Sequence, residues 1–489
     1  MPTFSTRRRG PATRLYTVPA NRYSPLQPGG SMATIDLAAE TRHGTDRQDG
    51  SQLAIHGGRP VVGRGEIDEQ WPLVSEGDIA AVTATLRSGK LTWINNETVP
   101  ALERAWAEYV GTRFCIAFNS GTSALQAAVA AAGVEPGDEV LVPALTFMAS
   151  AAAIVHHQGL PVFVDVDPWT YNLDPALLAG QITGRTRAVM AVHLSGLPAP
   201  MDEILDFARP RGLKVIEDLS QAAGATYKGR KVGSIGDVGA CSIMAGKNLP
   251  TAGEGGLLTT DDAEMRNRAD QLKMFGERIA ESGEREFNVA TMSMNYRFSS
   301  ILASFTLSQL ERLDDYSTRV QEGARYLSRG MAEIPGLLPP FVPEGSAHVY
   351  HHFRFRVDPK AAGIDLPVGR FRKALQDLVS AEGVPLKQYQ NRPVAGQWLF
   401  QEQRGCPWRC GHASREIRYD IHDYPQTLDV LRSSLLIGNR LCMATFFEKR
   451  NLDLYLEAFH KVFRHRDELV AYGRALDYRE PWEEELRVS

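Results

Sequence analysis

Three groups of small and polar residues in the middle of the chain have the types and spacing to do chemistry together. The first is Asn119-Ser120-Gly121-Thr122-Ser123, which lies between a short apolar run and an alanine-rich segment. Small residues in such a place leave backbone N–H groups free at the start of a helix, where they can bind a phosphate. A tight turn in which Thr122 or Ser123 merely caps the helix explains the same residues equally well.

The second group is Glu217-Asp218-Leu219-Ser220-Gln221, in which two acids end the apolar run Val215-Ile216. A carboxylate at the end of a buried strand needs a cationic partner or water. The alternative is that Asp218 only caps a following helix.

The third group runs from Ser242 to Asn248 and is followed by Gly253-Glu254-Gly255-Gly256. Its centre is Lys247, one of only 11 lysines among the 54 basic residues. Most lysines are solvated surface groups. A lysine set among small and apolar residues instead has a lowered pKa and can form a Schiff base.

A phosphate cradle, a carboxylate and an amine are the groups that pyridoxal 5′-phosphate requires. The cradle anchors the phosphate, the lysine binds the aldehyde, and the carboxylate keeps the pyridine nitrogen protonated so that the ring can accept electrons from a carbanion. The three groups together predict a pyridoxal phosphate site in which Lys247 and Asp218 are the catalytic residues.

The segments around these groups alternate between short apolar runs and helical stretches. Such alternation predicts an α/β fold with a mostly parallel sheet, and ligands bind beyond the carboxyl ends of its strands, where all three groups fall. The expected strands are 114–118, 139–142, 161–166, 187–193, 214–218, 239–243 and 256–260, and the expected helices are 122–132, 147–157, 174–181 and 201–209.

After about residue 262 the pattern becomes mainly helical. Residues 276–286 are polar without a period and predict a surface loop, whereas 301–316 have the spacing of one amphipathic helix. A smaller unit is expected to contain a strand at 351–357 and helices at 371–379 and 452–463. The polar stretch 388–424 has no clear assignment.

We therefore expect four regions: a disordered extension over 1–52, a large cofactor-binding domain over 53–330, a small C-terminal domain over 331–475 and a tail over 476–489. The extension carries five arginines before its first acid, Asp36, and is dense in Pro, Gly, Ser and Thr. A transit peptide or a basic arm would fit the same composition, and Met32 is an alternative start.

The composition of the 489 residues, 43% hydrophobic and 23% charged, is that of a globular protein. A net charge of −4 argues against a nucleic-acid partner, and the mild apolar run from Ala144 to Val155 is too short to cross a membrane. Five cysteines are a sparse, odd count, typical of a reducing compartment, so we expect a cytoplasmic protein.

No metal is expected. Cys406, Cys410 and His412 match no standard zinc spacing. We expect His348, His351 and His352, on a predicted strand, to be structural or to line the substrate site.

The sequence resembles the DegT/DnrJ/StrS family of PLP-dependent sugar aminotransferases from about Leu53 to Leu313, and more weakly to about residue 470. The resemblance rests on five elements in order, Ser120–Leu125, Pro136–Val140, Glu217-Asp218 with Gln221, Gly253–Gly256 and Asn295-Tyr296-Arg297. It implies a fold-type I PLP-dependent transferase, similar to aspartate aminotransferase, with a seven-stranded sheet, a smaller α+β domain and a homodimer with shared active sites.

The same resemblance implies a role for individual residues. Lys247 looks like the aldimine lysine and Asp218 like the partner of the pyridinium nitrogen. Gln221 would hydrogen-bond near the phenolic oxygen, and Phe147 would stack on the ring. The phosphate would be held by Thr122 with the amide of Gly121 or Ser123, by Ser242, and by Asn295 from the neighbouring subunit.

The chain departs from the family pattern in three places. Ile243 stands where the family usually has Phe, Trp93-Ile94-Asn95-Asn96 replaces a segment that usually contains Gly, and the stretch 388–424 is longer than usual. These departures affect the acceptor substrate rather than the cofactor. Relatives that replace the lysine by His dehydrate their substrate, so Lys247 favours transamination.

The resemblance implies an aminotransferase that takes an amino group from L-glutamate or L-glutamine and gives it to a cyclic ketone. The opening Leu53–Pro60 with Trp71-Pro72 resembles the branch that acts on keto-cyclitols or aminoshikimate-type rings in antibiotic pathways; a nucleotide-linked keto-sugar is the other candidate. A dehydratase or aromatising synthase of the aminohydroxybenzoate type is one alternative. A non-catalytic regulator that binds PLP or a sugar is another, against which Lys247 argues.

Overall fold

The computed structural model describes residues 52–67, 69–92, 95–279, 285–410, 417–438 and 443–483. Several sequence predictions fall outside these residues: the disorder of 1–51, the alternative start at Met32, Trp93-Ile94 of the substituted segment, His412, and residues 484–489 of the tail. The boundaries expected at residues 52, 330 and 475 stay predictions.

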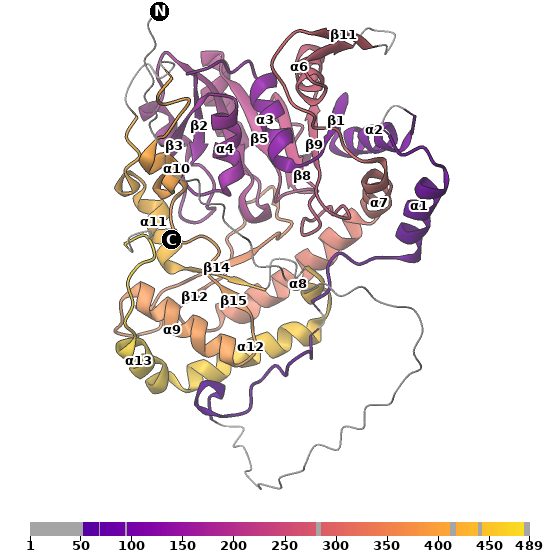
Figure 1. The fold of residues 1–489 in the computed structure, drawn as a ribbon. Helices are drawn as coiled ribbons and strands as arrows, with labels where there is room; N and C mark the ends of the chain where they lie inside the picture. Colours follow the sequence, from indigo (N-terminus) through magenta and orange to yellow (C-terminus); the bar gives the residue numbers. More distant parts are fainter. Residues whose placement is uncertain are drawn as a thin grey trace, which may run out of the picture. The chain divides into compact units, whose positions relative to one another are not determined.

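A seven-stranded sheet in the order β1-β9-β8-β5-β4-β2-β3 forms the centre of the fold, and the predicted mostly parallel sheet is confirmed (Figure 1). The strands from β8 to β3 are parallel, whereas β9 is antiparallel to both of its neighbours. Their near-continuous burial is typical of a sheet covered on both faces. The strands are β1 (Phe114–Phe118), β2 (Glu139–Pro143), β3 (Leu160–Val164), β4 (Thr186–Val192), β5 (Lys214–Asp218), β8 (Val238–Ser242) and β9 (Gly256–Thr260).

The predicted helices between these strands are present, except that the one expected at 174–181 is a short 3-10 helix over Pro175–Gly180. The helix α3 begins at a capping box, in which Ser120 and Ser123 each bind the other's backbone N–H. It contacts β8 and β9 and both of the helices α4 and α6. The helices of this part are α1 (Glu76–Arg87), α2 (Thr98–Val110), α3 (Gly121–Ala131), α4 (Met148–His156), α5 (Met201–Ala208), α6 (Ala263–Lys273) and α7 (Ser300–Leu310).

A second, four-stranded antiparallel sheet in the order β12-β14-β16-β15 has a hydrophobic core of its own. Phe353, Phe355 and Val357 of β14 point into this core, which α8, α9 and α12 complete (Figure 1). The elements are α8 (Leu313–Ala332), β12 (Leu337–Leu338), β14 (Phe353–Val357), α9 (Val368–Ala381), β15 (Leu386–Lys387), α11 (Pro425–Ser433), β16 (Ser434–Ile437), α12 (Lys449–Arg464) and α13 (Arg466–Ala475). A third, small sheet joins β6 (Thr226–Tyr227), β7 (Arg230–Lys231) and β13 (Ser346–Ala347).

Two sequence predictions about regular structure are wrong. In the loop expected at 276–286, residues 277–279 and 285–286 belong to two paired antiparallel strands, β10 (Glu277–Ile279) and β11 (Arg285–Val289). Phe287 and Val289 of β11 are exposed, so the strand lacks the buried face that would give an alternating pattern. The single helix expected at 301–316 is two helices, since the chain turns at Glu311-Arg312 between α7 and α8. The turn is needed because the two helices pack on different hydrophobic cores. Leu302 of α7 packs on the core of the large sheet, and Tyr316 of α8 packs in the core of the four-stranded sheet.

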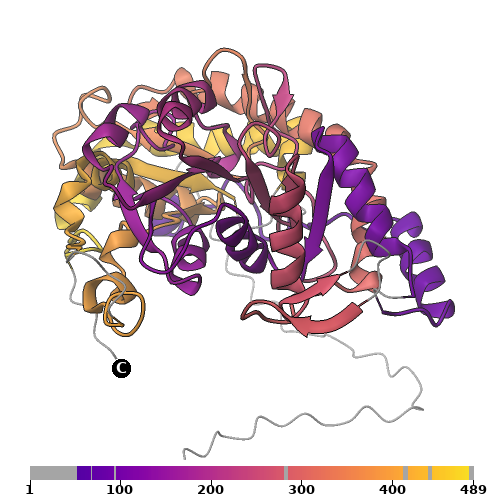
Figure 2. The ribbon, with the colours of Figure 1, turned by 90° about the horizontal axis from the view of Figure 1, so that it is seen from above.

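The stretch 388–424, which had no assignment from the sequence, covers the edge of the large sheet. The Tyr419 hydroxyl donates to the carbonyl of Pro161 at 3.0 Å, and the Phe400 and Phe163 rings meet edge to face at 5.0 Å. This covers the open edge of β3, which could otherwise pair with another chain. The segment, with α10 (Trp398–Glu402), lies beside β3, whereas α1 and α2 lie beside the opposite edge at β1 (Figure 2).

Cys406 and Cys410 in this stretch form a disulfide, whereas the sequence predicted reduced thiols. Their Cα atoms are 5.2 Å apart, a separation that a disulfide can bridge. Two cysteines four residues apart in an irregular loop give no sequence signal for this pairing. In the described part of the chain, no helix is long and apolar enough to cross a bilayer.

A buried ion pair fastens the first described residues to the second core. The carboxylate of Glu382 accepts hydrogen bonds from the backbone N–H groups of Ala54 and Val61, at 2.8 and 3.1 Å, and pairs with Lys461 at 2.9 Å. Lys461 also donates to the carbonyl of Arg59 at 2.8 Å. Both side chains are almost fully buried, so each charge depends on the other.

Glu382→Gln should therefore lower the free energy of unfolding by about 3–5 kcal/mol, because it leaves a buried ammonium unpaired. Denaturant unfolding measures the change. Glu457→Gln is the matched control, since Glu457 forms an exposed ion pair with Arg464 at 2.7 Å on α12, the helix that carries Lys461. This substitution should lower the free energy of unfolding by less than ~1 kcal/mol. Equal losses in the two variants would contradict this account of the ion pair.

Candidate active site

A cavity of ≈ 250 Å³ lies at the carboxyl ends of β4, β5 and β8 and against the N-terminus of α3. This is where ligands bind in open α/β sheets. Residues of all three groups singled out in the sequence line it, together with two histidines and a tyrosine from beyond residue 350. The lining includes Ser120, Gly121, Thr122, Thr146, Phe147, Asp218, Ser220, Gln221, Ser242, Lys247, Glu254, His351, His352 and Tyr389.

The N-terminus of α3 offers a cradle for an anion. The N–H groups of Gly121 and Thr122 have no acceptor within the described residues, whereas the capping box engages that of Ser123. The helix start lies directly against the end of β8: a Cβ on Gly121 would lie 2.4 Å from the Cβ of Ser242. Only glycine permits this approach, which brings the Ser242 hydroxyl beside the free N–H groups.

Asp218 ends β5 with both carboxylate oxygens engaged. The Ser150 hydroxyl donates to Oδ2 at 2.6 Å, and the backbone N–H of Ser220 donates to Oδ1 at 3.0 Å. No α-helix follows β5, so the alternative that Asp218 caps a helix is wrong. The carboxylate is 5% exposed and lines the cavity, so it presents a fixed negative charge there.

The neighbouring Glu217 faces away from the cavity and holds a loop. Its carboxylate accepts from the N–H groups of Gly233, Ile235 and Gly236 and pairs with the buried His193 at 3.1 Å. Burial by itself would raise the pKa of Glu217, but these hydrogen bonds and the His193 ring keep it below its ordinary value. Of the two acids in the motif, only Asp218 remains for chemistry.

Lys247 follows β8 in a tight turn, with its N–H bonded to the carbonyl of Met244 at 2.8 Å. Its own carbonyl accepts from Nε1 of the buried Trp71 at 3.1 Å. Burial lowers the pKa of the Lys247 amine, although the nearby Asp218 carboxylate acts in the opposite direction. Nζ makes no hydrogen bond or ion pair with any described residue, so the amine is available to a ligand.

His351 adds a neutral ring to the wall. Its Nδ1 lies 2.9 Å from Oδ1 of Asn248, whose Nδ2 donates to the carbonyl of Val349 at 3.0 Å and so fixes the amide. Nδ1 of His351 must therefore carry a proton. Burial lowers the ring's pKa well below its ordinary value, and the nearby His352 and Lys247 add to this effect. A neutral ring protonated at Nδ1 has an acceptor nitrogen at Nε2.

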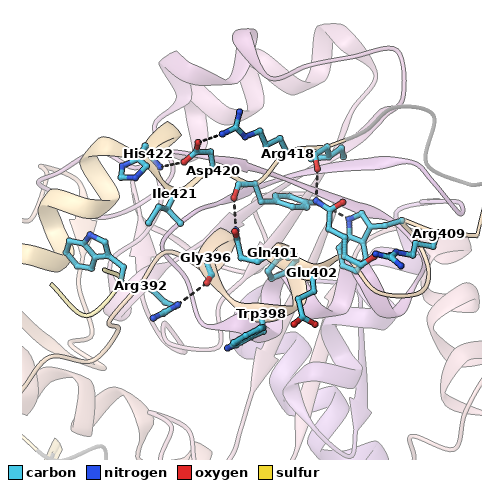
Figure 3. Close-up of a pocket in the computed structure, with 16 residues that line it drawn as sticks. Arg392, Gly396, Trp398, Gln401, Glu402, Arg409, Arg418, Asp420, Ile421 and His422 are labelled. Atoms are coloured by element: carbon cyan, nitrogen blue, oxygen red, sulfur yellow. Dashed lines mark hydrogen bonds and ion pairs between the residues drawn. The ribbon is translucent and has the colours of Figure 1, made fainter. Parts of the chain in front are cut away.

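A larger cavity of ≈ 1160 Å³ opens in the edge-covering segment between Arg392 and His422 (Figure 3). Its arginines are already bonded within the chain: Arg392 to the carbonyl of Gly396, Arg409 to that of Gln403, and Arg418 to the carboxylate of Asp420. No predicted site residue lines it. Of these two cavities, only the smaller one is lined by the predicted site residues.

The sequence model of the DegT/DnrJ/EryC1/StrS aminotransferase family matches residues 72–422. This chain belongs to that family. The spore coat polysaccharide biosynthesis protein SpsC of Bacillus subtilis is 40% identical over 299 residues, which cover 60% of this chain and 76% of that protein. The L-glutamine:scyllo-inosose aminotransferase of Streptomyces griseus is 37% identical over 336 residues, or 66% and 78% of the two chains.

Among solved structures, 3-amino-5-hydroxybenzoic acid synthase matches with a TM-score of 0.71 and 27% identity, covering 81% of this chain and 98% of that one. The predicted fold-type I architecture is thereby confirmed. The protein is an aminotransferase that depends on pyridoxal phosphate, as the sequence predicted. The cavity fits that cofactor, since it combines free N–H groups, a fixed carboxylate and an unengaged amine.

Within this aminotransferase, the cavity brings together seven of the residues expected to hold the cofactor. They are Gly121, Thr122, Phe147, Asp218, Gln221, Ser242 and Lys247. Oε1 of Gln221 accepts from the N–H of Ser195 at 2.7 Å, which leaves its Nε2 as the donor for a ligand. The Phe147 ring lies at the start of α4 and is 57% exposed, so one face is open to stacking.

Two expected residues do not line this cavity. The Ser123 hydroxyl is engaged in the capping box of α3 and with Oδ1 of Asn119 at 2.8 Å. Asn295 is exposed and binds the guanidinium of Arg297 at 2.9 Å. Among the three predicted histidines, His351 and His352 line the cavity, whereas His348 is buried against Tyr350 with a pKa lowered to about 3 by burial.

Sequence reasoning missed Ser150, Glu254 and Tyr389 as parts of the site. Tyr389 lies in the segment without a periodic pattern, and Ser150 lies in an alanine-rich helix 68 residues from the carboxylate it binds. Glu254 belongs to the motif Gly253–Gly256, but nothing in the spacing of that motif indicates that Glu254 lines the cavity.

Gly121→Ala should weaken binding of pyridoxal phosphate about ten- to a hundredfold, because the added methyl group pushes the helix start away from Ser242. Equilibrium titration of the cofactor-free protein measures this. Gly184→Ala is the control, since a Cβ at that position meets nothing within 4 Å. Unchanged affinity in Gly121→Ala would show that the cradle is not where the phosphate binds.

Proposed function

We propose that this protein transfers an amino group from L-glutamate or L-glutamine to a cyclic ketone, either a keto-cyclitol or a nucleotide-linked keto-sugar. The observation that carries the proposal is the unengaged amine of Lys247 in the same cavity as the fixed carboxylate of Asp218. Transfer requires a base that can take a proton from the donor's Cα and return it elsewhere, and an acid–base group must be mobile and unpaired to do so.

Lys247 is the proposed base. A lowered pKa leaves a larger fraction of the amine neutral near pH 7, and only the neutral amine can accept a proton at Nζ. Its backbone is fixed at both the N–H and the carbonyl, so the side chain moves from a rigid base. Glu254, which also lines the cavity, acts against the fall in the pKa of Lys247, as Asp218 does.

Pyridoxal phosphate, when bound, supplies an aldehyde for amine chemistry and a ring that accepts electrons. The N–H groups of Gly121 and Thr122 and the hydroxyl of Ser242 are the proposed phosphate ligands, and Phe147 would cover one face of the ring. Asp218 would face the ring nitrogen and hold its proton, and Gln221 would donate from Nε2 to the ring oxygen. The neutral His351 and Tyr389 would then meet the substrate, whose hydroxyl groups suit such partners.

The names of relatives support both acceptor classes. One relative is an L-glutamine:scyllo-inosose aminotransferase, and GDP-perosamine synthase of Caulobacter vibrioides is 39% identical over 269 residues. Antibiotic or aminosugar biosynthesis is the corresponding pathway.

A second candidate function is dehydration with aromatisation, which the match to 3-amino-5-hydroxybenzoic acid synthase favours. Mass spectrometry of products from a panel of keto-cyclitols and keto-sugars separates the two, since dehydration removes water and transamination does not.

Lys247→Ala should lower the single-turnover release of the 2-oxo acid from L-glutamate or L-glutamine by about 10²–10⁴-fold, since the variant lacks its general base. Quantifying the oxo acid by mass spectrometry gives the rate. Lys228→Ala is the matched control, because Lys228 is an exposed lysine that pairs with Asp202 and contacts the Tyr227 ring at the surface, away from the cavity lining. A Lys247→Ala rate within threefold of the unmodified protein would rule out the proposed base.

The site is also proposed to be shared across a homodimer. Asn295 is exposed and lies outside its own chain's cavity, which is consistent with service to a partner's phosphate. Lys247→Ala and Asn295→Ala proteins, each inactive or impaired, can be unfolded together and refolded as mixed dimers. One site of a mixed dimer then has both lesions and the other has none, so up to one working site per mixed dimer should return.

Each variant refolded alone provides the baseline for this experiment, and Asn295→Ala alone should be clearly impaired, since a hydrogen bond to a charged group is worth roughly 1.5–3 kcal/mol. If Asn295 served its own chain, every site of the mixed dimer would keep one lesion. No activity would then return above the baseline.

A further inference from the structure

Two buried hydroxyl groups, those of Thr146 and Ser150, form a chain that ends at the Asp218 carboxylate. The Ser150 and Thr146 hydroxyls lie 2.9 Å apart, and the Ser150 hydroxyl lies 2.6 Å from Oδ2 of Asp218. Ser150 is fully buried, and Thr146 and Asp218 are 1% and 5% exposed. The three groups thus interact out of contact with bulk water, where hydrogen bonds are strongest.

The direction of this chain follows from the acceptor at its end. An ionised carboxylate only accepts, so the single hydroxyl proton of Ser150 points to Asp218. Thr146 must then be the donor to Ser150. Two hydroxyl groups in series therefore polarise toward the carboxylate and strengthen the hydrogen bond that holds it.

The same short segment carries both the Phe147 ring, which lines the cavity, and the Ser150 hydroxyl, which binds Asp218. Thr146 precedes α4, Phe147 caps it and Ser150 lies in its first turn, so the aromatic ring and the hydroxyl that holds Asp218 share one rigid element. The segment is fastened from outside by the edge-covering stretch: the Gln390 amide donates to the carbonyl of Thr146, and the N–H of Val394 donates to that of Ala144 at 3.0 Å.

We propose that Ser150 is a positioning residue for the aminotransferase reaction: its hydroxyl, held by Thr146, fixes the Asp218 carboxylate in the orientation and the charge state that the cofactor's ring nitrogen requires. This rests on the proposed role of Asp218. Ser150 touches neither substrate nor cofactor in this account and acts only through the carboxylate.

The consequence concerns one proton. With the cofactor bound, Asp218 would hold a proton at the ring nitrogen, and the hydrogen bond from Ser150 to the carboxylate would help to keep that proton on nitrogen. Without the Ser150 hydroxyl the proton would move toward oxygen, and the ring would accept electrons less well. The donor half-reaction should slow while binding of the donor stays the same.

The test is a double-mutant cycle on the holoenzyme, with single-turnover release of the 2-oxo acid as the rate. Ser150→Ala should lower the maximal rate about ten- to a hundredfold, the value of a hydrogen bond to a charged group, with an unchanged half-saturating donor concentration. In an Asp218→Asn background the same substitution should change the rate less than threefold, since the carboxylate on which it acts is gone. Equal fold-losses in both backgrounds would overturn the proposal.

A second readout does not use turnover. With ¹⁵N-labelled pyridoxal phosphate bound, the ring-nitrogen resonance should move toward its unprotonated value in Ser150→Ala and stay in place in Ser304→Ala, which loses a buried helix hydroxyl bonded to the carbonyl of Ile301. An unmoved resonance in Ser150→Ala would contradict the proposal.

If Ser150→Ala does not fold, Thr146→Val tests the chain one link further out. It should lower the rate about two- to tenfold, as for a neutral hydrogen bond, and lose this effect in the Asp218→Asn background. An unmodified enzyme that releases no oxo acid would refute the proposed function itself. An active enzyme whose rate is insensitive to both hydroxyls would refute only the role of Ser150.

Discussion

The carboxylate of Asp218 is the group that the rest of the site must accommodate. It ends a strand that is buried in the middle of the large sheet, where an unsatisfied charge costs several kcal/mol or more. A backbone N–H group and a hydroxyl group engage its two oxygens, and the carboxylate lines the same cavity as the Lys247 amine.

The cradle at α3 depends on a different constraint, the close approach of two backbones. The start of α3 contacts the end of β8 at a position where only glycine fits, and the capping box of Ser120 and Ser123 fixes the helix start without using the first two N–H groups. An anion site of this kind is built from backbone N–H groups and contains no ionised side chain. It therefore destabilises the folded protein little when no ligand is bound. The same geometry explains why the Ser123 side chain lies outside the cavity although its neighbours line it.

Much of this arrangement could be predicted from the sequence because it is local. Strands such as 114–118 and 214–218 contain short apolar runs, and Lys247 stands out as a lysine among small residues in an arginine-rich chain. The sequence predictions that failed concern features that depend on residues far along the chain, or strands that have no buried face. The turn at Glu311-Arg312 lies between helices that pack on two different cores, and no sequence pattern indicates that division. In β11, Phe287 and Val289 are exposed to solvent. Tyr389 and Ser150 join the site only through contacts far along the chain.

The central claim is that the amine of Lys247 is the group that holds and serves the cofactor. The most direct measurement is to load the protein with pyridoxal phosphate, reduce it with borohydride, digest it and locate the pyridoxyl group by mass spectrometry. The account predicts one group per chain, attached to Lys247. Attachment to another lysine, such as the buried Lys273 beside Glu103 and Asp270, or no attachment at all, would contradict it.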